Sequence, residues 1–433
     1  YEKLAGAGYL TSQQGSGTYV ALRRQASAKP ARPTDDRDER LNPIWLADDI
    51  ASAMGFWRES SGRDIGVRPV AADFRPALVD PQHFPYAAFR RASTKQLREL
   101  ERKPAKLRSP QGNQGNYGLR DVITRHIALT RAIACRADDI LVTCGAQQAF
   151  DLLARILVRP GHTIVAIEDP GYPPLRVPFT AAGAVVVAVP VDDEGLIVEA
   201  LPEGTRVICV TPSHQFPLGV AMSSARRQAL IAYAQRHGAV IIEDDYDGEF
   251  RYEGSPLEAL KAADTADVVF YVGTFSKCML PSLRLGFIVA PDWALRTLVA
   301  AKNALDWHCA TPLQVTVAGF IADGHLARHV RKMRDIYGRR RELLRRSFDG
   351  PLGKWFEPIP SFYGMHTTAI ARPGVDVETA AARVLSDGIK IHTLDRYFVG
   401  EPTRTGLIFG YGAAEPAQLA LGIEKLCQAF SPT

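Results

Sequence analysis

The segment VVFYVGTFSKCMLPSLR, residues 268–284, opens with five apolar, β-branched or aromatic residues that predict a buried strand. Lys277 follows just beyond the glycine that breaks this run. A lysine partly removed from water has a lowered pKa and can form a Schiff base with an aldehyde. Thr274 and Ser276 can donate hydroxyl groups to a phosphate, and Arg284 can neutralise it through a bidentate contact. Alone, the segment would equally suit a surface turn with a solvated lysine.

A second apolar run, residues 239–242, ends in the acidic sequence EDDYD. Pyridoxal phosphate requires a carboxylate that keeps its ring nitrogen protonated, which Asp244 can supply, and a donor to its phenolic oxygen, which Tyr246 can supply. Ligands of open α/β sheets bind at the carboxyl ends of the strands, so we expect both residues to lie near the lysine. Asp245 and Asp247 are expected to cap the following helix instead.

The motifs GTFSK and IIEDDYDGEFRY resemble those of fold-type I aminotransferases. TPSHQFPLG, residues 211–219, and CGAQQAFDLLAR, residues 144–155, are more similar to the aminotransferase-like domain of MocR-type transcriptional regulators, which belong to the GntR superfamily. The resemblance spans about residues 73–426. It implies a doubly wound, mostly parallel α/β domain that binds pyridoxal 5'-phosphate, followed by a small α+β C-terminal domain. It also implies a homodimer.

A glycine turn after the predicted strand 140–143 opens a helix whose free backbone N–H groups can hold a phosphate, and we assign Ala146 and Gln147 to that task. By resemblance, Tyr172 stacks on the pyridine ring, although a lone tyrosine more often packs in a core. The complete predicted cofactor set, with Lys277 as the Schiff-base residue, is Ala146, Gln147, Tyr172, Asp244, Tyr246, Thr274, Ser276, Lys277 and Arg284.

Three positions depart from the family pattern. Pro110 stands where related enzymes carry a tyrosine that contacts the cofactor phosphate of the neighbouring subunit. Phe216 stands where they carry an asparagine that bonds the cofactor phenolate, and His214 or Gln215 could substitute. Ile408 stands at the arginine that binds the substrate α-carboxylate. Isoleucine cannot bind a carboxylate, so efficient transamination of ordinary α-amino acids is disfavoured.

Candidate contacts for an effector are fewer. Arg75 lies in a segment that resembles the one covering the cofactor, where a structural salt bridge is an equal alternative. Arg404 lies near Ile408 but out of register with it. His214 could shuttle a proton, against the alternative of a hydrogen-bonded loop histidine. The sequence contains neither HExxH nor paired Cys/His spacing, so we predict no metal site.

The first twenty residues predict the end of a helix closed by Gly8, then a hairpin with strands at 9–11 and 18–20. The combination of AGAGYL and GSGTYV resembles the tail of a GntR-type winged helix-turn-helix, which implies DNA as a partner. The chain opens on Tyr1 without an initiator Met, and we expect most of the DNA-reading domain to precede it.

Composition is that of a globular protein, with 46% hydrophobic and 23% charged residues in 433 and a net charge of +5. No apolar run is long enough to cross a membrane, and the six cysteines, without CxxC pairing, indicate reduced core thiols of a cytoplasmic protein. The length predicts several domains, which we assign as the wing (1–20), a linker (21–42), the large cofactor-binding domain (43–310) and the small domain (311–433).

These observations predict a transcriptional regulator that senses pyridoxal phosphate, or an amine that forms an aldimine with it, through the Schiff base at Lys277. The effector would displace the internal linkage, alter the domain geometry and so change the affinity for DNA. A pyridoxal phosphate-dependent aminotransferase that uses Lys277 as a proton shuttle is the alternative. Because of the wing, we expect sensing rather than enzymatic turnover.

Overall fold

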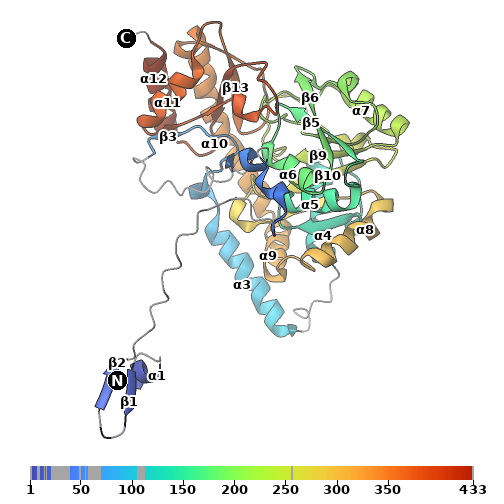
Figure 1. Ribbon diagram of the computed structural model, residues 1–433, viewed down its shortest axis with the longest axis vertical. Helices are drawn as coiled ribbons and strands as arrows, with labels where there is room; N and C mark the ends of the chain where they lie inside the picture. Colours follow the sequence, from blue (N-terminus) through green and yellow to red (C-terminus); the bar gives the residue numbers. More distant parts are fainter. Residues whose placement is uncertain are drawn as a thin grey trace. The chain divides into compact units, whose positions relative to one another are not determined.

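The computed structural model describes residues 2–6, 10–13, 15, 17–20, 40–47, 50–53, 55–56, 70–104, 113–254 and 257–431. The chain divides into two compact units, Tyr1–Ala47 and Asp48–Thr433 (Figure 1).

In the first unit, α1 (Glu2–Gly6) precedes a two-stranded antiparallel sheet formed by β1 (Leu10–Gln13) and β2 (Gly17–Val20). The predicted hairpin is therefore confirmed, with each strand slightly longer than the sequence indicated. Gly8, the predicted helix end, lies outside the described residues, and so does most of the predicted linker. The winged helix-turn-helix itself stays a prediction.

The second unit is built around an eight-stranded sheet with the strand order β4-β11-β10-β9-β8-β5-β6-β7. Neighbouring strands from β10 through β6 are parallel, β11 is antiparallel to β10 and β4, and β7 is antiparallel to β6. The predicted doubly wound, mostly parallel sheet is confirmed. Its strands are β4 (Ile140–Thr143), β5 (Ile164–Asp169), β6 (Val185–Asp192), β7 (Gly195–Leu196), β8 (Thr205–Val210), β9 (Val240–Asp245), β10 (Val269–Thr274) and β11 (Gly286–Val289).

Helices cover both faces of this sheet, because its central strands carry apolar side chains on both sides. On one face α5, α6 and α8 pack against residues such as Leu141 and Ile242. On the other face α3, α4 and α9 pack against Val142 and Tyr271, and α7 packs against Ile241. The helices are α3 (Tyr86–Arg102), α4 (Tyr117–Arg131), α5 (Ala146–Leu157), α6 (Pro173–Ala181), α7 (Ser224–His237), α8 (Asp292–Leu305) and α9 (Thr311–Ala322).

A smaller α+β layer follows, drawn in orange to red in Figure 1. Its four-stranded sheet has the order β12-β13-β16-β15, and its longest helices are α10 and α12. The elements are α10 (His325–Phe348), β12 (Phe356–Pro358), β13 (His366–Ala371), α11 (Val377–Ser386), β14 (Ile389–Lys390), β15 (His392–Thr393), β16 (Gly406–Gly410) and α12 (Pro416–Phe430).

Two segments pack across the predicted domain boundary at residue 310. Helix α9, which follows that boundary, places Val317 and Phe320 in the same core as α3 and α4 of the larger layer. Strand β3 (Ala72–Asp73) pairs with β14, and the adjacent Phe74 contacts Phe409 of the smaller layer at 5.8 Å between ring centroids. The segment that begins at β3 therefore belongs structurally to the smaller layer, although it lies early in the chain.

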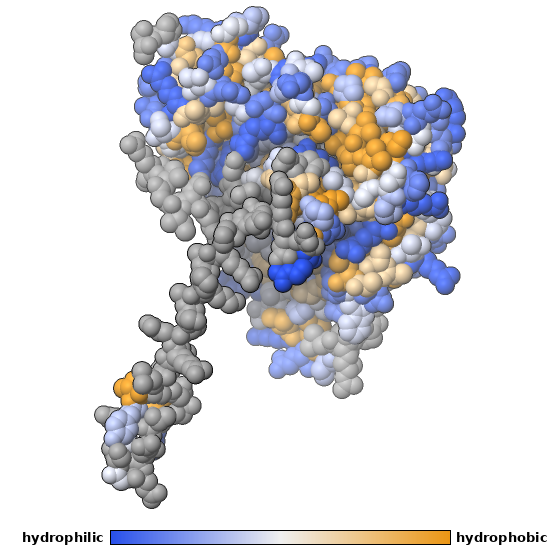
Figure 2. Space-filling view, viewed as in Figure 1, coloured by the Kyte–Doolittle hydropathy of each residue, from blue (hydrophilic) through white to orange (hydrophobic). Residues whose placement is uncertain are grey.

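The visible surface of the larger unit intersperses charged and apolar side chains (Figure 2). Among the described helices, none combines the length and the apolar character needed to cross a membrane.

Candidate functional site

A cavity of about 430 Å³ opens at the carboxyl ends of the central strands. This volume lies within the range of small-molecule sites. All nine residues of the predicted cofactor set line it. The complete lining is Phe56, Ala77, Ala146, Gln147, Tyr172, Phe216, Asp244, Tyr246, Thr274, Ser276, Lys277, Pro281 and Arg284.

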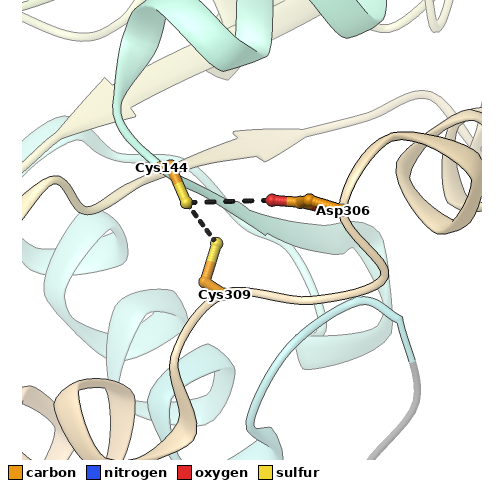
Figure 3. Close-up of side chains that lie close together, drawn as sticks. All are labelled: Cys144, Asp306 and Cys309. Atoms are coloured by element: carbon orange, nitrogen blue, oxygen red, sulfur yellow. Dashed lines mark hydrogen bonds between the residues drawn. The ribbon is translucent and has the colours of Figure 1, made fainter. Parts of the chain in front are cut away.

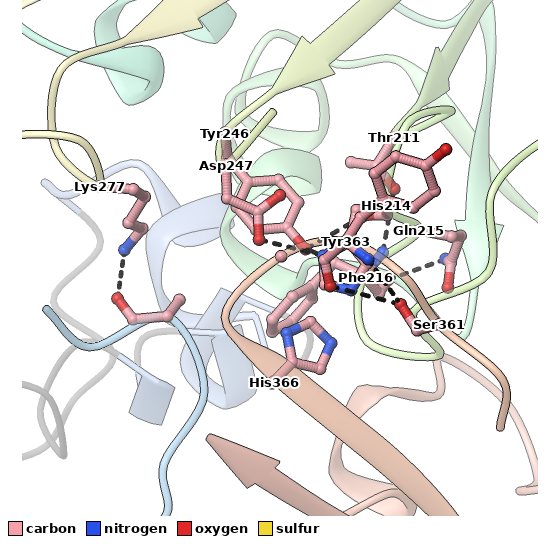
Figure 4. A network of polar contacts seen from close by, with 12 residues as sticks. Thr211, His214, Gln215, Phe216, Tyr246, Asp247, Lys277, Ser361, Tyr363 and His366 are labelled. Carbon is pink, nitrogen blue, oxygen red and sulfur yellow. Dashed lines mark hydrogen bonds and ion pairs between the residues drawn. The ribbon is translucent and has the colours of Figure 1, made fainter. Parts of the chain in front are cut away.

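Lys277 lies in the turn after β10, and its Nζ donates a 2.6 Å hydrogen bond to the backbone carbonyl of Ala77 (Figure 4). Burial lowers the pKa of the lysine to about 8. The carboxylates of Asp247 and Asp244 oppose that change in pKa, and the guanidinium of Arg284 reinforces it. Near neutral pH an appreciable fraction of the amine is therefore unprotonated, which is the nucleophilic form.

Asp244 lies in β9 directly beside Val272 of β10, so the strand register brings it to the cavity wall. Its Oδ1 is buried and has no hydrogen-bond partner among the described residues. Burial, reinforced by Asp245, Asp247 and Glu168, raises the pKa of this carboxyl group to about 8, while Lys277 lowers it. A ligand that carries an N–H group at this point would supply the missing donor, as a protonated pyridine nitrogen does.

Five of the lining residues offer donors for an anion. The amino end of α5 has no side-chain cap and exposes the backbone at Ala146 and Gln147. Thr274 Oγ1 and Ser276 Oγ are 2.9 Å apart, and Arg284 is the only arginine among the described residues that lines the cavity. These groups suit a phosphate, which accepts several hydrogen bonds and prefers a bidentate guanidinium.

Aromatic rings form the remaining wall. Phe216 meets Tyr172 and Tyr246 edge to face, with centroid distances of 5.7 and 5.9 Å. The Tyr246 hydroxyl donates to the backbone carbonyl of His214 at 3.0 Å, so the tyrosine is held in place from outside the cavity. Phe216, at the predicted asparagine position, therefore offers a planar apolar surface and no hydrogen bond.

His214 lies behind Tyr246 and not in the cavity lining (Figure 4). It is 2% exposed, and its Nδ1 is 3.0 Å from Asp247 Oδ2. The side-chain amide of Gln215 donates to the carbonyls of Pro170 and Phe216, at 2.8 Å each. Both side chains are thus engaged in the protein interior.

The expectation that Asp245 and Asp247 cap a helix is wrong. Asp245 forms a buried ion pair with Arg131 at 2.6 Å and accepts a hydrogen bond from the Tyr271 hydroxyl at 2.6 Å. Asp247 pairs with His214, and through its charge it acts on Lys277. The partners lie far away in the sequence, so the local acidic pattern could not reveal them.

The two other predicted effector residues are also absent from the cavity lining. Arg75 forms a 2.6 Å ion pair with Asp73, and Arg404 lies 3.7 Å from Asp193. Ile408 is fully buried in an apolar cluster that contains Phe216. Pro110 lies outside the described residues.

Three lining residues were not predicted: Phe56, Ala77 and Pro281. Pro281 lies only four residues after Lys277, so its place near the lysine could have been inferred from the sequence. Ala77 contributes a backbone carbonyl, which no side-chain pattern can identify.

Comparisons with known proteins give concordant results. The family model for aminotransferase class I and II matches residues 85–406. The "Probable rhizopine catabolism regulatory protein MocR" of Rhizobium meliloti is 31% identical over 99% of this chain and 85% of its own length. The "HTH-type pyridoxine biosynthesis transcriptional regulator PdxR" of Corynebacterium glutamicum is 30% identical over 100% of this chain and 86% of its own. The kynurenine aminotransferase of Pyrococcus horikoshii, solved with PMP, superposes with a TM-score of 0.78 at 25% identity, covering 90% of this chain and 97% of its own.

The depressed lysine pKa predicts a distinctive pH profile. In ligand-free protein, acetylation of Lys277 by acetic anhydride should rise with a midpoint near pH 8, because only the neutral amine reacts. Asp244→Asn removes a charge that stabilises the ammonium, so its midpoint should be lower than that of the wild type. Quantitative peptide mass spectrometry measures both, with the exposed Lys95 as internal reference. A wild-type midpoint at the ordinary lysine value of 10.5 would contradict the burial argument.

Proposed function

Since the chain belongs to the MocR-type family of HTH-type transcriptional regulators with an aminotransferase class I and II domain, we propose that it regulates transcription in response to pyridoxal 5'-phosphate or an amine that condenses with it. The observation that carries this proposal is the cavity, which is lined by a lysine of lowered pKa, by Asp244 and by the uncapped amino end of α5; Asp244 Oδ1 has no hydrogen-bond partner among the described residues.

Pyridoxal phosphate, when bound, supplies an aldehyde that condenses with amines and an electron-withdrawing ring. In our proposal Asp244 accepts the ring N–H, and Tyr172 and Phe216 enclose the ring. Tyr246 would donate its hydroxyl proton to the phenolic oxygen in place of its present bond to the carbonyl of His214. Lys277 provides the amine that holds the cofactor covalently.

In our proposal a second group of lining residues binds the phosphate of the cofactor. In this group Ala146 and Gln147 offer the amino end of α5, Thr274 and Ser276 offer hydroxyl groups, and Arg284 offers the balancing charge. Arg284 Nη2 donates to the carbonyl of Cys144 at 2.9 Å, which directs its guanidinium toward this helix end. The set combines the full positive charge of Arg284, the partial positive charge of a helix amino end and several hydrogen-bond donors, which suits a phosphate.

A structural route for the response begins at the hydrogen bond between Lys277 and Ala77. Ala77 follows the segment that starts at β3, and this segment is tied to the smaller layer by β3–β14 pairing and by the 2.6 Å bond from Gly410 N to Phe74 O. An amine committed to a ligand cannot make the same bond to Ala77. Ligand binding at Lys277 would therefore remove the hydrogen bond that holds Ala77. Loss of this bond would allow the segment, and the smaller layer to which it is tied, to change position.

If the protein is a transcriptional regulator, its N-terminal part binds DNA, and the hairpin β1–β2 is the wing of a winged helix-turn-helix. We also propose a homodimer, since two half-sites on DNA are read by paired domains, and a cytoplasmic location, where a regulator meets DNA. The domain limits 1–20, 21–42, 43–310 and 311–433 remain part of this proposal. Arg75, His214 and Arg404 remain candidate effector contacts, and each would have to leave its present partner to act as one.

The experiment that tests the covalent role is reductive trapping. Incubation with pyridoxal phosphate and then borohydride should leave a phosphopyridoxyl group on the peptide that contains Lys277. Lys277→Arg keeps the positive charge but cannot condense, so the trapped product should disappear completely. Lys95→Arg, an exposed lysine, is the matched control and should trap as the wild type does. Trapping at another lysine would refute the assignment.

The alternative function, an aminotransferase, makes a different prediction. Among the described residues no arginine besides Arg284 lines the cavity, and Ile408 is buried in an apolar cluster. A substrate α-carboxylate would therefore enter without a guanidinium partner and at a desolvation cost. We expect common L-amino acids to perturb the cofactor absorbance weakly and to yield at most a stoichiometric amount of keto acid. Rapid multiple turnover with any of them would favour the enzyme over the sensor.

A further inference from the structure

Two cysteines from distant parts of the chain meet close to the amino end of α5 (Figure 3). Cys144 lies between β4 and α5, and Cys309 lies between α8 and α9. Their sulfur atoms are 3.2 Å apart, and all six cysteines are free thiols. No other pair of thiols among the described residues is in such contact. Two sulfur atoms at this distance must approach each other by about 1 Å to form a disulfide bond.

The surroundings of the pair supply a positive charge. Lys302 is fully buried, and its Nζ lies 3.5 Å from Cys309 Sγ. The same ammonium is 2.5 Å from Asp306 Oδ1 and 3.1 Å from Gln148 Oε1. Cys144, Asp306 and Cys309 would also be a plausible donor set for a metal ion, but the ammonium already occupies the place where a cation would bind. The arrangement suits a thiolate stabilised by lysine better than a metal centre.

The two sulfur atoms differ in character. Cys144 is half-buried, whereas Cys309 is 4% exposed. The hydrogen bond between the two sulfur atoms, reinforced by Lys302 and Arg284, lowers the pKa of Cys144 to about 7. Burial opposes this change, and so does the Asp306 carboxylate, whose Oδ2 lies 3.9 Å from Cys144 Sγ. The same hydrogen bond, together with burial, raises the pKa of Cys309. Cys144 is thus the accessible thiolate, and Cys309 is the protonated neighbour that can resolve its oxidised form.

We propose that Cys144 and Cys309 are a peroxide-sensitive dithiol pair whose oxidation to a disulfide weakens the binding of phosphate-bearing ligands in the adjacent cavity. The Cys144 thiolate attacks a hydroperoxide: an S–O bond forms, the O–O bond breaks, and the departing oxygen leaves as water or alcohol with a proton from solvent. The Cys309 thiol then attacks the Cys144 sulfur: the S–S bond forms, the S–O bond breaks, and the hydroxyl group leaves as water with the thiol proton. Two electrons pass from the thiols to the peroxide.

Disulfide formation is expected to affect the cavity because Cys144 is joined along the chain to residues that line it. Cys144 directly precedes Gly145 and Ala146, which begin α5, and its carbonyl accepts the hydrogen bond from Arg284. Gly145 packs directly against Arg284, since a Cβ atom added there would lie 3.1 Å from the guanidinium. Drawing the Cys144 sulfur toward Cys309 therefore moves the helix end and the arginine that we assign to the phosphate. This part rests on the proposed function, whereas the cross-link itself does not.

The cross-link is tested by mass spectrometry of the full chain. Reduced protein is treated with a small excess of hydrogen peroxide, alkylated and digested without reductant. We expect a peptide pair that joins Cys144 to Cys309, lighter by two hydrogen atoms than its parts and separated by dithiothreitol. Cys309→Ser should instead leave a sulfenic acid on Cys144 that dimedone traps, because the resolving thiol is gone. Cys135→Ser, half-buried and without a thiol neighbour among the described residues, is the matched control and should cross-link as the wild type does.

The coupling is tested by titrating reduced and oxidised protein with pyridoxal phosphate and following its absorbance. Loss of one hydrogen bond to a charged group corresponds to affinity about tenfold weaker, which we expect for the oxidised wild type and not for peroxide-treated Cys309→Ser. If no cross-link forms, the proposal that Cys144 and Cys309 are a redox pair is wrong. If the cross-link forms but the affinity for pyridoxal phosphate is unchanged, the proposed effect of oxidation on ligand binding is wrong. If reduced protein does not bind pyridoxal phosphate, the proposed function and the coupling both fail, while the mass measurement still decides the cross-link.

Discussion

The chemistry of the cavity depends on two ionisable groups that are buried away from water, Asp244 and Lys277. Each is destabilised in its charged form, since burial raises the pKa of the carboxyl group and lowers that of the amine. A buried polar atom without a partner costs about 1–3 kcal/mol, and Asp244 Oδ1 is such an atom among the described residues. A ligand that donates a hydrogen bond to the Asp244 carboxylate and bonds to the Lys277 amine removes this cost. The ligand-bound protein is therefore expected to be more stable than the ligand-free protein.

The sheet makes this arrangement possible. Parallel pairing of β9 and β10 places Asp244 beside Val272, and the chain then turns at the end of β10 toward Lys277. Gly273 is needed there, because a Cβ atom would lie 2.3 Å from the ring of Phe287. The neighbouring Asp245 is neutralised by Arg131, so only one of the consecutive carboxylates is left for a ligand.

The sequence was informative wherever function depends on a side chain at a strand end. The apolar runs predicted the strands, and the resemblance of the motifs that follow them to fold-type I aminotransferases implied the mostly parallel sheet. Residue chemistry and this resemblance together predicted all nine residues that converge in the cavity. It was uninformative for contacts between distant segments. The carbonyl of Ala77, the pairing of Asp247 with His214 and the proximity of Cys144 to Cys309 are set by tertiary packing alone. Asp245 was misjudged for the same reason.

The central claim is that occupancy of Lys277 changes the affinity of the protein for DNA, and linkage between these two equilibria tests it most directly. The full-length protein would be titrated, with and without saturating pyridoxal phosphate, against a DNA fragment selected from a random library. We expect the cofactor to change the dissociation constant by about fivefold or more in the wild type, which is the lower end of typical allosteric coupling, and to leave it unchanged in Lys277→Arg. Equal affinities with and without the cofactor in the wild type would contradict the account.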